Sequence, residues 1–351
     1  MEISTEMKEM LDLMLRPAFY VADGIIRHIN PSAAALMLCE GQPISAVICT
    51  GGEEYDNFTQ GCLHLDIRIA GKPMAATVIR RDGGDIFLPE SPVSPAQFQI
   101  LSLAAAQLRE PLAGLMAITD QILPDTDPKQ AALANRRLHQ LLRMIGNMSD
   151  VQRLSDPDSC RMEYTDICAF LEELLEKAQS LLSRSGVRIC SQIPRDSIYT
   201  LMDREQMERA IYNLLSNAAK YSNADTAIQV ELSRHGKRLY LSVQSNSAYQ
   251  NPIPVGNYYS RYLREPLLED PAQGLGLGIV LIRAAASNHG GAVLIDQPEG
   301  QGTRITMSLA IRQGKSNVVR SPVLMIDYTG ERDHALIELA DVLPPELYTV
   351  E

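Results

Sequence analysis

A regular row of apolar residues near the middle of the chain limits its fold more than any other feature. The row runs through residues 98–122 in steps of three and four, with one step of seven. Its members are Phe98, Leu101, Ala105, Leu108, Leu112, Leu115 and Ile122. Such heptad spacing is typical of a helix that packs along a seam. Pro111 lies inside the row, where it removes one backbone hydrogen bond and predicts a kink.

A second long helix is expected over residues 128–154, after turn-forming residues 124–128. Its apolar row is again spaced three and four residues apart, at Leu138, Leu141, Ile145 and Met148. Two such helices form a hairpin that cannot bury its seam alone, so pairing with a second copy into a four-helix bundle is the expected solution. Packing of the hairpin on other domains of its own chain is the alternative.

The residues before the hairpin, 8–90, predict a small mixed domain. Apolar runs flank Asp23-Gly24, a dipeptide typical of a tight antiparallel turn. Asn30 precedes a short helix and can cap its free N–H groups. Three alternating strands are then expected, over residues 62–69, 74–80 and 86–88.

The residues after the hairpin, 160–312, predict alternating helices and strands. Helices are expected over residues 167–182, 205–221 and 277–288. Strands are expected over residues 187–189, 228–232, 239–243, 292–295 and 303–309. Helices gathered on one face of a mixed sheet make an α/β sandwich. The fold class predicted for the whole chain is therefore α+β and multidomain.

The residues 108–112, Leu-Arg-Glu-Pro-Leu, resemble the phosphoacceptor helix of sensor histidine kinases, whose motif reads His-Glu-Leu-Arg-Thr-Pro-Leu. In this alignment the phosphorylated histidine falls on Ala106 and the neighbouring acid on Gln107. A methyl group is no nucleophile, so the resemblance implies a degenerate member without a catalytic acceptor. His139, on the second helix, lies away from the acceptor position and is expected in solvent or at the edge of the seam.

The residues 213–222, Asn-Leu-Leu-Ser-Asn-Ala-Ala-Lys-Tyr-Ser, resemble a nucleotide-binding helix of the histidine kinase ATPase domain. Asn213 and Asn217 are four residues apart, so both amides project from one face of the helix. The resemblance implies that Asn217 holds Mg²⁺ through its oxygen, and that Lys220 and Tyr221 lie along the phosphates and base of ATP.

A glycine-rich run at residues 274–278 adds a second resemblance to that ATPase domain, because His289-Gly290-Gly291 follows at the family's spacing. Backbone N–H groups without neighbouring side chains can approach phosphate oxygens, and the helix that begins here adds its positive end. The predicted phosphate-binding positions are Gly274, Gly276 and Gly278.

The third nucleotide motif is altered. The family reads Val-x-Asp-x-Gly-x-Gly-Ile after the second hairpin strand, whereas residues 243–249 read Val-Gln-Ser-Asn-Ser-Ala-Tyr. Ser245 replaces the aspartate that accepts the adenine amino group, and Ser247 and Tyr249 replace glycines. Loss of a buried hydrogen-bond partner costs on the order of 1–3 kcal/mol, so weak ATP binding or none is expected.

The order of elements in residues 8–90 resembles PAS sensor domains, with Asn30-Pro31 matching the family's asparagine. The sequence identifies no ligand for this domain. At the other end, residues 313–351 lie beyond the resemblance and predict a strand over 323–327 and a helix over 332–343. This extension is expected to pack on the ATPase domain or on the hairpin.

Charge and composition exclude some functions. The formal net charge of -11 at pH 7 argues against a nucleic-acid surface. Residues 1–6 lack the basic and apolar regions of a secretory signal, and no window reaches the ~18 apolar residues that cross a bilayer. The six cysteines form no C-x-x-C pair, which is typical of reduced thiols. A cytoplasmic protein without a membrane segment is expected.

The combined prediction divides the chain into a PAS-like sensor domain, a dimerisation hairpin, a histidine-kinase-type ATPase domain and a C-terminal extension, at residues 8–90, 93–156, 160–312 and 313–351. The expected function is that of a non-catalytic scaffold or regulator in two-component signalling. It would act as a homodimer that docks the receiver domain of a response regulator or a partner histidine kinase. A divergent sensor kinase or ATPase that binds ATP and Mg²⁺ and still transfers phosphate is the alternative.

Overall fold

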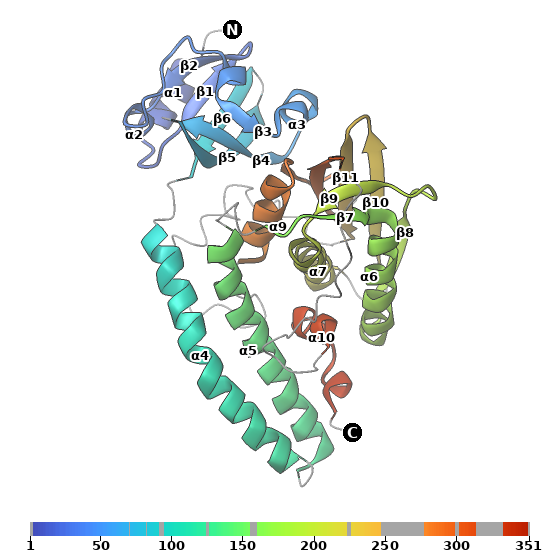
Figure 1. The fold of residues 1–351 in the computed structure, drawn as a ribbon. Coiled ribbons are helices and arrows are strands. Elements are labelled where there is room, and N and C mark those ends of the chain that lie inside the picture. Colours follow the sequence, from blue (N-terminus) through green and yellow to red (C-terminus); the bar gives the residue numbers. More distant parts are fainter. Residues whose placement is uncertain are drawn as a thin grey trace.

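The computed structural model describes residues 3–69, 71–81, 83–90, 95–123, 126–154, 160–222, 226–246, 277–298, 302–313 and 333–349. Figure 1 shows an N-terminal sheet, a long hairpin of two helices, and a second α/β part whose helices lie on the hairpin's side. In these described ranges, no helix combines the length and the apolar character that a membrane span requires.

The N-terminal part is an antiparallel sheet with short helices. Its strands are β1 Phe19–Ala22, β2 Ile25–Ile29, β3 Ile48–Thr50, β4 Cys62–Ile69, β5 Lys72–Arg81 and β6 Gly84–Pro89, and its helices are α1 Thr5–Asp12, α2 Pro31–Ala34 and α3 Gly52–Asn57. The spatial order is β2-β1-β6-β5-β4, with β3 paired to β4. The predicted turn is confirmed, because Asp23 and Gly24 join β1 to β2 with φ angles of 53° and 70°. Asn30 caps α2, as expected, by accepting a hydrogen bond from the Ala33 N–H at 2.8 Å.

The hairpin consists of α4 Pro95–Ile122 and α5 Pro128–Leu154, the two long helices that the apolar rows predict. Its seam is formed by Ala105, Leu112 and Met116 of α4 against Leu138 and Ile145 of α5. Other members of the predicted row on α4 are open to solvent, with 48% of Leu108, 55% of Leu115 and 58% of Ile122 exposed. The seam within one chain therefore buries only part of the row.

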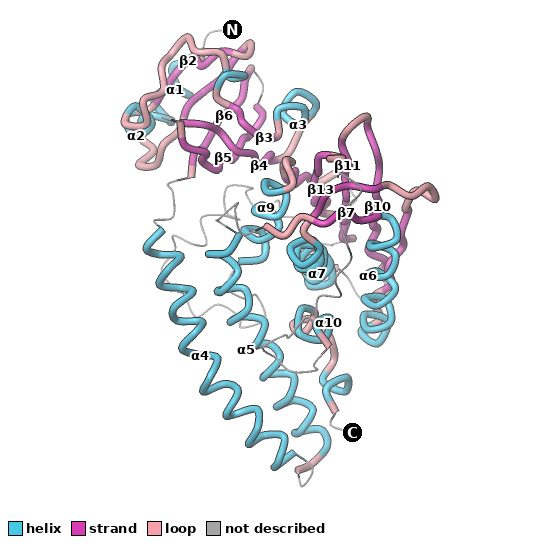
Figure 2. The backbone as a smooth tube through the Cα atoms, in the orientation of Figure 1, coloured by secondary structure: helices cyan, strands magenta, loops and turns pink. Residues whose placement is uncertain are grey.

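The second α/β part places helices over a mixed sheet, and Figure 2 shows these two layers. Its helices are α6 Ile167–Leu182, α7 Arg204–Tyr221 and α9 Leu277–Asn288, and its strands are β7 Glu163–Asp166, β8 Arg188–Gln192, β9 Tyr199–Met202, β10 Ala227–His235, β11 Arg238–Ser245, β12 Val293–Asp296 and β13 Thr303–Ala310. The sheet order is β12-β13-β11-β10-β8, with β8 parallel to β10, while β7 pairs with β9 apart from it. The predicted mixed α/β sandwich is confirmed.

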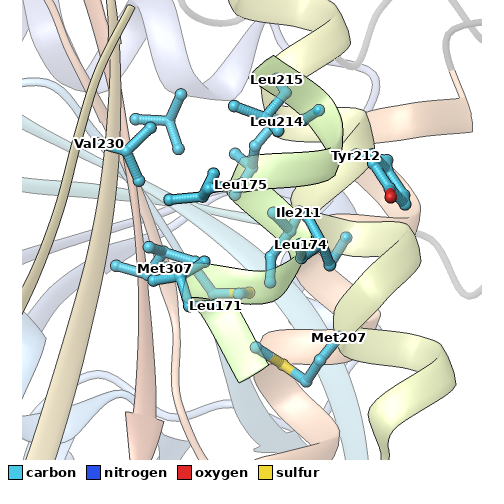
Figure 3. Close-up of a cluster of buried hydrophobic side chains, with 14 of the residues drawn as sticks. Leu171, Leu174, Leu175, Met207, Ile211, Tyr212, Leu214, Leu215, Val230 and Met307 are labelled. Carbon is cyan, nitrogen blue, oxygen red and sulfur yellow. The ribbon is translucent and has the colours of Figure 1, made fainter. Parts of the chain in front are cut away.

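The core between these layers fixes the position of α7. Leu174 of α6 and Ile211 and Leu215 of α7 are buried against Val230 and Met307 of the sheet (Figure 3). Full burial of such a side chain contributes about 1.5–3 kcal/mol. Because its apolar stripe is held in this core, α7 presents its polar side chains away from the sheet.

The two sheets join edge to edge. Strand β12 pairs antiparallel with β4, so that Val293 lies opposite His64 and Ile295 opposite Cys62. Arg283 of α9 supports the join by donating to the Glu90 carboxylate at 2.6 Å. The backbone pairing couples the N-terminal part directly to the second α/β part, and no local pattern in the sequence predicted it.

Gly61 allows the close approach of β4 to β12. Its φ is +92°, and a Cβ at this position would lie 2.4 Å from the carbonyl oxygen of Ile295. We expect Gly61→Ala to weaken the β4–β12 pairing by about 1–3 kcal/mol, because overpacking forces the strands apart. Faster hydrogen exchange of the β12 amides would measure this loss.

Gly71→Ala is the matched control for that experiment. Gly71 also has a positive φ, +78°, but a Cβ there would meet nothing within 4 Å. Both variants therefore carry the backbone strain, and only Gly61→Ala carries the clash. Equal exchange rates of the β12 amides in the two variants would contradict the pairing of β4 with β12.

Candidate functional site

Helix α7 carries several of the residues that the sequence predicted for the nucleotide site. Asp203 caps the helix by accepting from the Gln206 N–H at 3.0 Å. One helical turn apart, Asn213 is buried and Asn217 half-buried, and α9 lies against both through Gly278. A Cβ on Gly278 would lie 2.9 Å from Asn213 Oδ1 and 3.8 Å from Asn217 Nδ2. The structure therefore brings Asn213, Asn217 and Gly278 together.

Other predicted positions lie elsewhere or outside the described residues. Gly274, Gly276 and the side chain of Tyr221 are not described. Ser245 ends β11 with only 4% of its surface exposed, and its hydroxyl donates to the carbonyl of Thr303 at 3.2 Å. The hydroxyl hydrogen is thus used within the sheet, on the neighbouring strand β13.

Arg143 of α5 reaches the polar face of α7 and was not predicted as a site residue. Its Nη2 donates to Asn213 Oδ1 at 3.2 Å, and its Nη1 donates to Ser216 Oγ at 3.1 Å. Only 6% of the Arg143 side chain is exposed. An arginine every few residues on a polar helix carries no distinguishing signal in the sequence, which is why sequence analysis missed this one.

Asp341, from the C-terminal segment, completes this charged cluster. Its Oδ2 accepts from Arg143 Nη1 at 2.6 Å and from Lys220 Nζ at 2.6 Å. Glu338, which is almost fully buried, places Oε2 3.6 Å from Arg143 Nε. Burial lowers the pKa of the Lys220 ammonium and the charge of Arg143 lowers it further, while Asp341 acts in the opposite direction. Asp341 Oδ2 is thus the common acceptor for Arg143 Nη1 and Lys220 Nζ.

The C-terminal segment, residues 333–349, lies between α5 and the second α/β part (Figure 1). It contains α10 His334–Glu338 and a 3₁₀ turn at Pro345–Tyr348. Asn135 of α5 donates to the Tyr348 carbonyl at 3.0 Å, and Arg136 donates to the carbonyls of Ala340 and Asp341, each at 3.1 Å. The extension was expected to pack on the hairpin or the ATPase domain, and this segment packs on both.

The hairpin offers no accessible imidazole among its described residues. Ala106 is exposed on α4. His139 has 4% of its surface exposed, donates from Nδ1 to the Asn135 carbonyl at 2.8 Å, and lies edge-on to Tyr348 with ring centroids 4.8 Å apart. The expectation that His139 lies in solvent or at the edge of the seam is wrong, because the C-terminal segment covers it.

As arranged, three polar side chains of the predicted nucleotide site already have partners within the chain. The Asn213 oxygen accepts from Arg143, Lys220 is paired with Asp341, and the Ser245 hydroxyl donates to Thr303. Within the described part of the chain, no group of three or more His, Cys, Asp or Glu side chains could hold a metal ion. The cation and anion partners that a nucleotide complex would bring are supplied here by Arg143 and Asp341.

Comparisons with known proteins agree with this architecture. Residues 202–313 match the family described as "Histidine kinase-, DNA gyrase B-, and HSP90-like ATPase". Similar curated proteins include the sensor histidine kinase WalK of Bacillus subtilis, 20% identical over 59% of this chain and 35% of its own length. The adaptive-response sensory kinase SasA of Parasynechococcus marenigrum is 26% identical over 63% of this chain and 58% of its own length. The chain thus spans about a third to three-fifths of these two relatives.

One solved structure is similar to part of the chain. Full-length ShkA in complex with AMPPNP is 20% identical to this chain and superposes with a TM-score of 0.49. The superposition covers 64% of this chain and 48% of ShkA.

The buried charges of the site predict the cost of removing Arg143. Arg143→Met would leave Asp341 and Glu338 without one of their cations, and breaking a buried pair costs about 3–5 kcal/mol. We expect the free energy of unfolding of the helical part, measured with denaturant, to fall by that amount. Arg137→Met is the control on the same helix, because Arg137 is exposed and contacts Gln140. Equal shifts for the two variants would contradict the assigned network.

Proposed function

We propose that this chain, which belongs to the histidine kinase family, serves two-component signalling as a non-catalytic regulator. The observation that carries the proposal is the exposed methyl of Ala106 at the acceptor position, together with the burial of His139, the hairpin's only histidine. Phosphoryl transfer to a protein needs a nucleophilic side chain that faces the γ-phosphate. Neither Ala106 nor His139 meets that requirement.

The nucleotide site supports the same proposal. Lys220 and Asn213, two polar residues of the predicted nucleotide-binding helix, are paired with other side chains of this chain. Ser245 offers a short hydroxyl in place of the carboxylate that receives adenine. Weak binding of ATP, or none, follows in the arrangement described.

A divergent kinase or ATPase is the second candidate. One observation favours it: Asn217 lies beside Gly278, at the start of α9, where the positive end of the helix would favour a phosphate. In that case Asn217 would hold Mg²⁺, Gly274, Gly276 and Gly278 would hold phosphates, and Tyr221 would lie along the base. The phosphate would pass to another protein.

The remaining assignments are part of the proposal. Residues 8–90 act as a PAS-like sensor of an unidentified signal, which the antiparallel order β2-β1-β6-β5-β4 and the capping role of Asn30 support. The hairpin, residues 93–156, docks a receiver domain or a partner histidine kinase. The ATPase domain, residues 160–312, and the extension, residues 313–351, regulate that docking. Arg109, whose Nη2 donates to Ser149 Oγ at 2.8 Å, is available on the docking surface, whereas Leu108 belongs to the proposed dimer seam.

Incubation of the full chain with Mg²⁺ and ATP labelled at the γ-phosphate tests whether the chain phosphorylates itself. We expect no acid-labile label, because no imidazole stands at the acceptor position. A sensor kinase with an intact histidine serves as the positive control. Label that disappears in Asn217→Ala would replace the proposal by the divergent-kinase candidate, and label that disappears in His139→Ala would identify the acceptor.

The exposed apolar row on the hairpin predicts a homodimer. Leu108 and Leu115 remain open in the single chain although their spacing is that of a packed seam. We expect Leu108→Glu with Leu115→Glu to convert a dimer to a monomer, because each buried charge would be unpaired. Sedimentation equilibrium measures the mass. Leu15→Glu is the control, since Leu15 is 98% exposed on another element. An unchanged mass in the double variant would exclude this seam.

A further inference from the structure

Arg143 and Lys220 form a partly enclosed anion site. Both cations lie 2.6 Å from the same oxygen of Asp341, and only 6% of the Arg143 side chain and 15% of the Lys220 side chain are exposed. Two cations this close repel each other in a low dielectric, so the site requires a negative charge. Ser216 and Asn213 hold the guanidinium in place and so fix the geometry of the pair.

The anion that meets this requirement comes from the far end of the chain. Asp341 is 198 residues from Arg143 and 121 residues from Lys220, and it reaches them because its segment is held at several points. Arg136 binds the backbone carbonyls beside Asp341, and Ser185 donates to the Val342 carbonyl at 3.0 Å. The segment therefore binds to its own chain as a peptide ligand would.

We propose that residues 333–349 are an internal competitor for this site, and that a polyphosphate group binds Arg143 and Lys220 only when Asp341 withdraws. A triphosphate supplies several negative oxygens and carries charge of the same sign as the carboxylate it would replace. The inference rests on the proposed function, in which the ATPase domain regulates docking and performs no transfer. It adds the regulation: binding at this site would release the segment from α5 and uncover His139 and the neighbouring face of the hairpin.

Competition of this kind has a measurable consequence. A ligand that binds only the open state has its affinity reduced by the fraction of molecules in that state. If the closed segment holds nine-tenths or more of the molecules, opening it tightens binding by about tenfold or more. Asp341→Asn keeps the shape of the side chain and removes the charge that attracts the two cations.

Titration calorimetry on the full chain, with inorganic triphosphate in one arm and ATP with Mg²⁺ in the other, tests the proposal. We expect Asp341→Asn to bind triphosphate about tenfold or more tightly than the unaltered chain does, and Asp341→Asn with Lys220→Gln to lose that gain. Tighter binding of ATP than of triphosphate would show that the base also contributes. Asp333→Asn is the control within the segment, because Asp333 pairs with Lys177 at 2.7 Å near the surface.

A second measurement needs no variant. Saturating triphosphate added to the unaltered chain should raise hydrogen exchange in residues 333–349 and in residues 135–143, whereas sodium chloride of equal ionic strength should not. Equal triphosphate affinity in Asp341→Asn and the unaltered chain, or no binding in either, would overturn the proposal. Label transfer to the hairpin would refute the regulator function alone, so the two failures are distinguishable.

Discussion

The need to neutralise two buried cations governs how the helical parts of this protein fit together. Arg143 on the hairpin and Lys220 on α7 come from different domains, and each would be costly to bury alone. Asp341 satisfies both through one oxygen, and Glu338 adds a second negative charge beside Arg143. The hairpin, α7 and the C-terminal segment are thereby fixed as one unit, since displacement of any one leaves a buried charge unpaired.

The second α/β part is also held at the edge of its sheet. Backbone pairing of β12 with β4 makes the N-terminal sheet and the sheet of the second α/β part continuous, and Arg283 binds Glu90 across the same boundary. A domain anchored both at the edge of its sheet and through α7 cannot rotate toward the hairpin without breaking one of the two contacts. The N-terminal sheet and the C-terminal segment therefore both contact the second α/β part, the sheet at β12 and the segment at α7.

Local patterns predicted the parts of this structure, and contacts between distant residues determined the rest. The apolar spacing in α4 and α5, the turn at Asp23-Gly24 and the helix at α9 are local, so the sequence locates them closely. The proximity of Asn213 and Asn217 to Gly278 was also predictable, because the two motifs that contain these residues resemble parts of one nucleotide site. The β4–β12 pairing and the binding of Asp341 join residues far apart, and such pairs leave no periodic signal. His139 was misplaced for the same reason, since the ring that covers it belongs to Tyr348.

Residues that the resemblance assigns to a nucleotide are present although Ala106 stands at the predicted acceptor position, and their charged partners offer a physical reason. A buried amide or ammonium that loses its ligand must find another partner, because an unsatisfied polar group costs about 1–3 kcal/mol. Here a cation, Arg143, meets the oxygen of Asn213, and an anion, Asp341, meets Lys220. Each substitute carries the sign of charge that a Mg²⁺–phosphate complex would bring to α7. We infer that these side chains now join domains, a role that requires their charge and hydrogen bonds and no phosphoryl transfer.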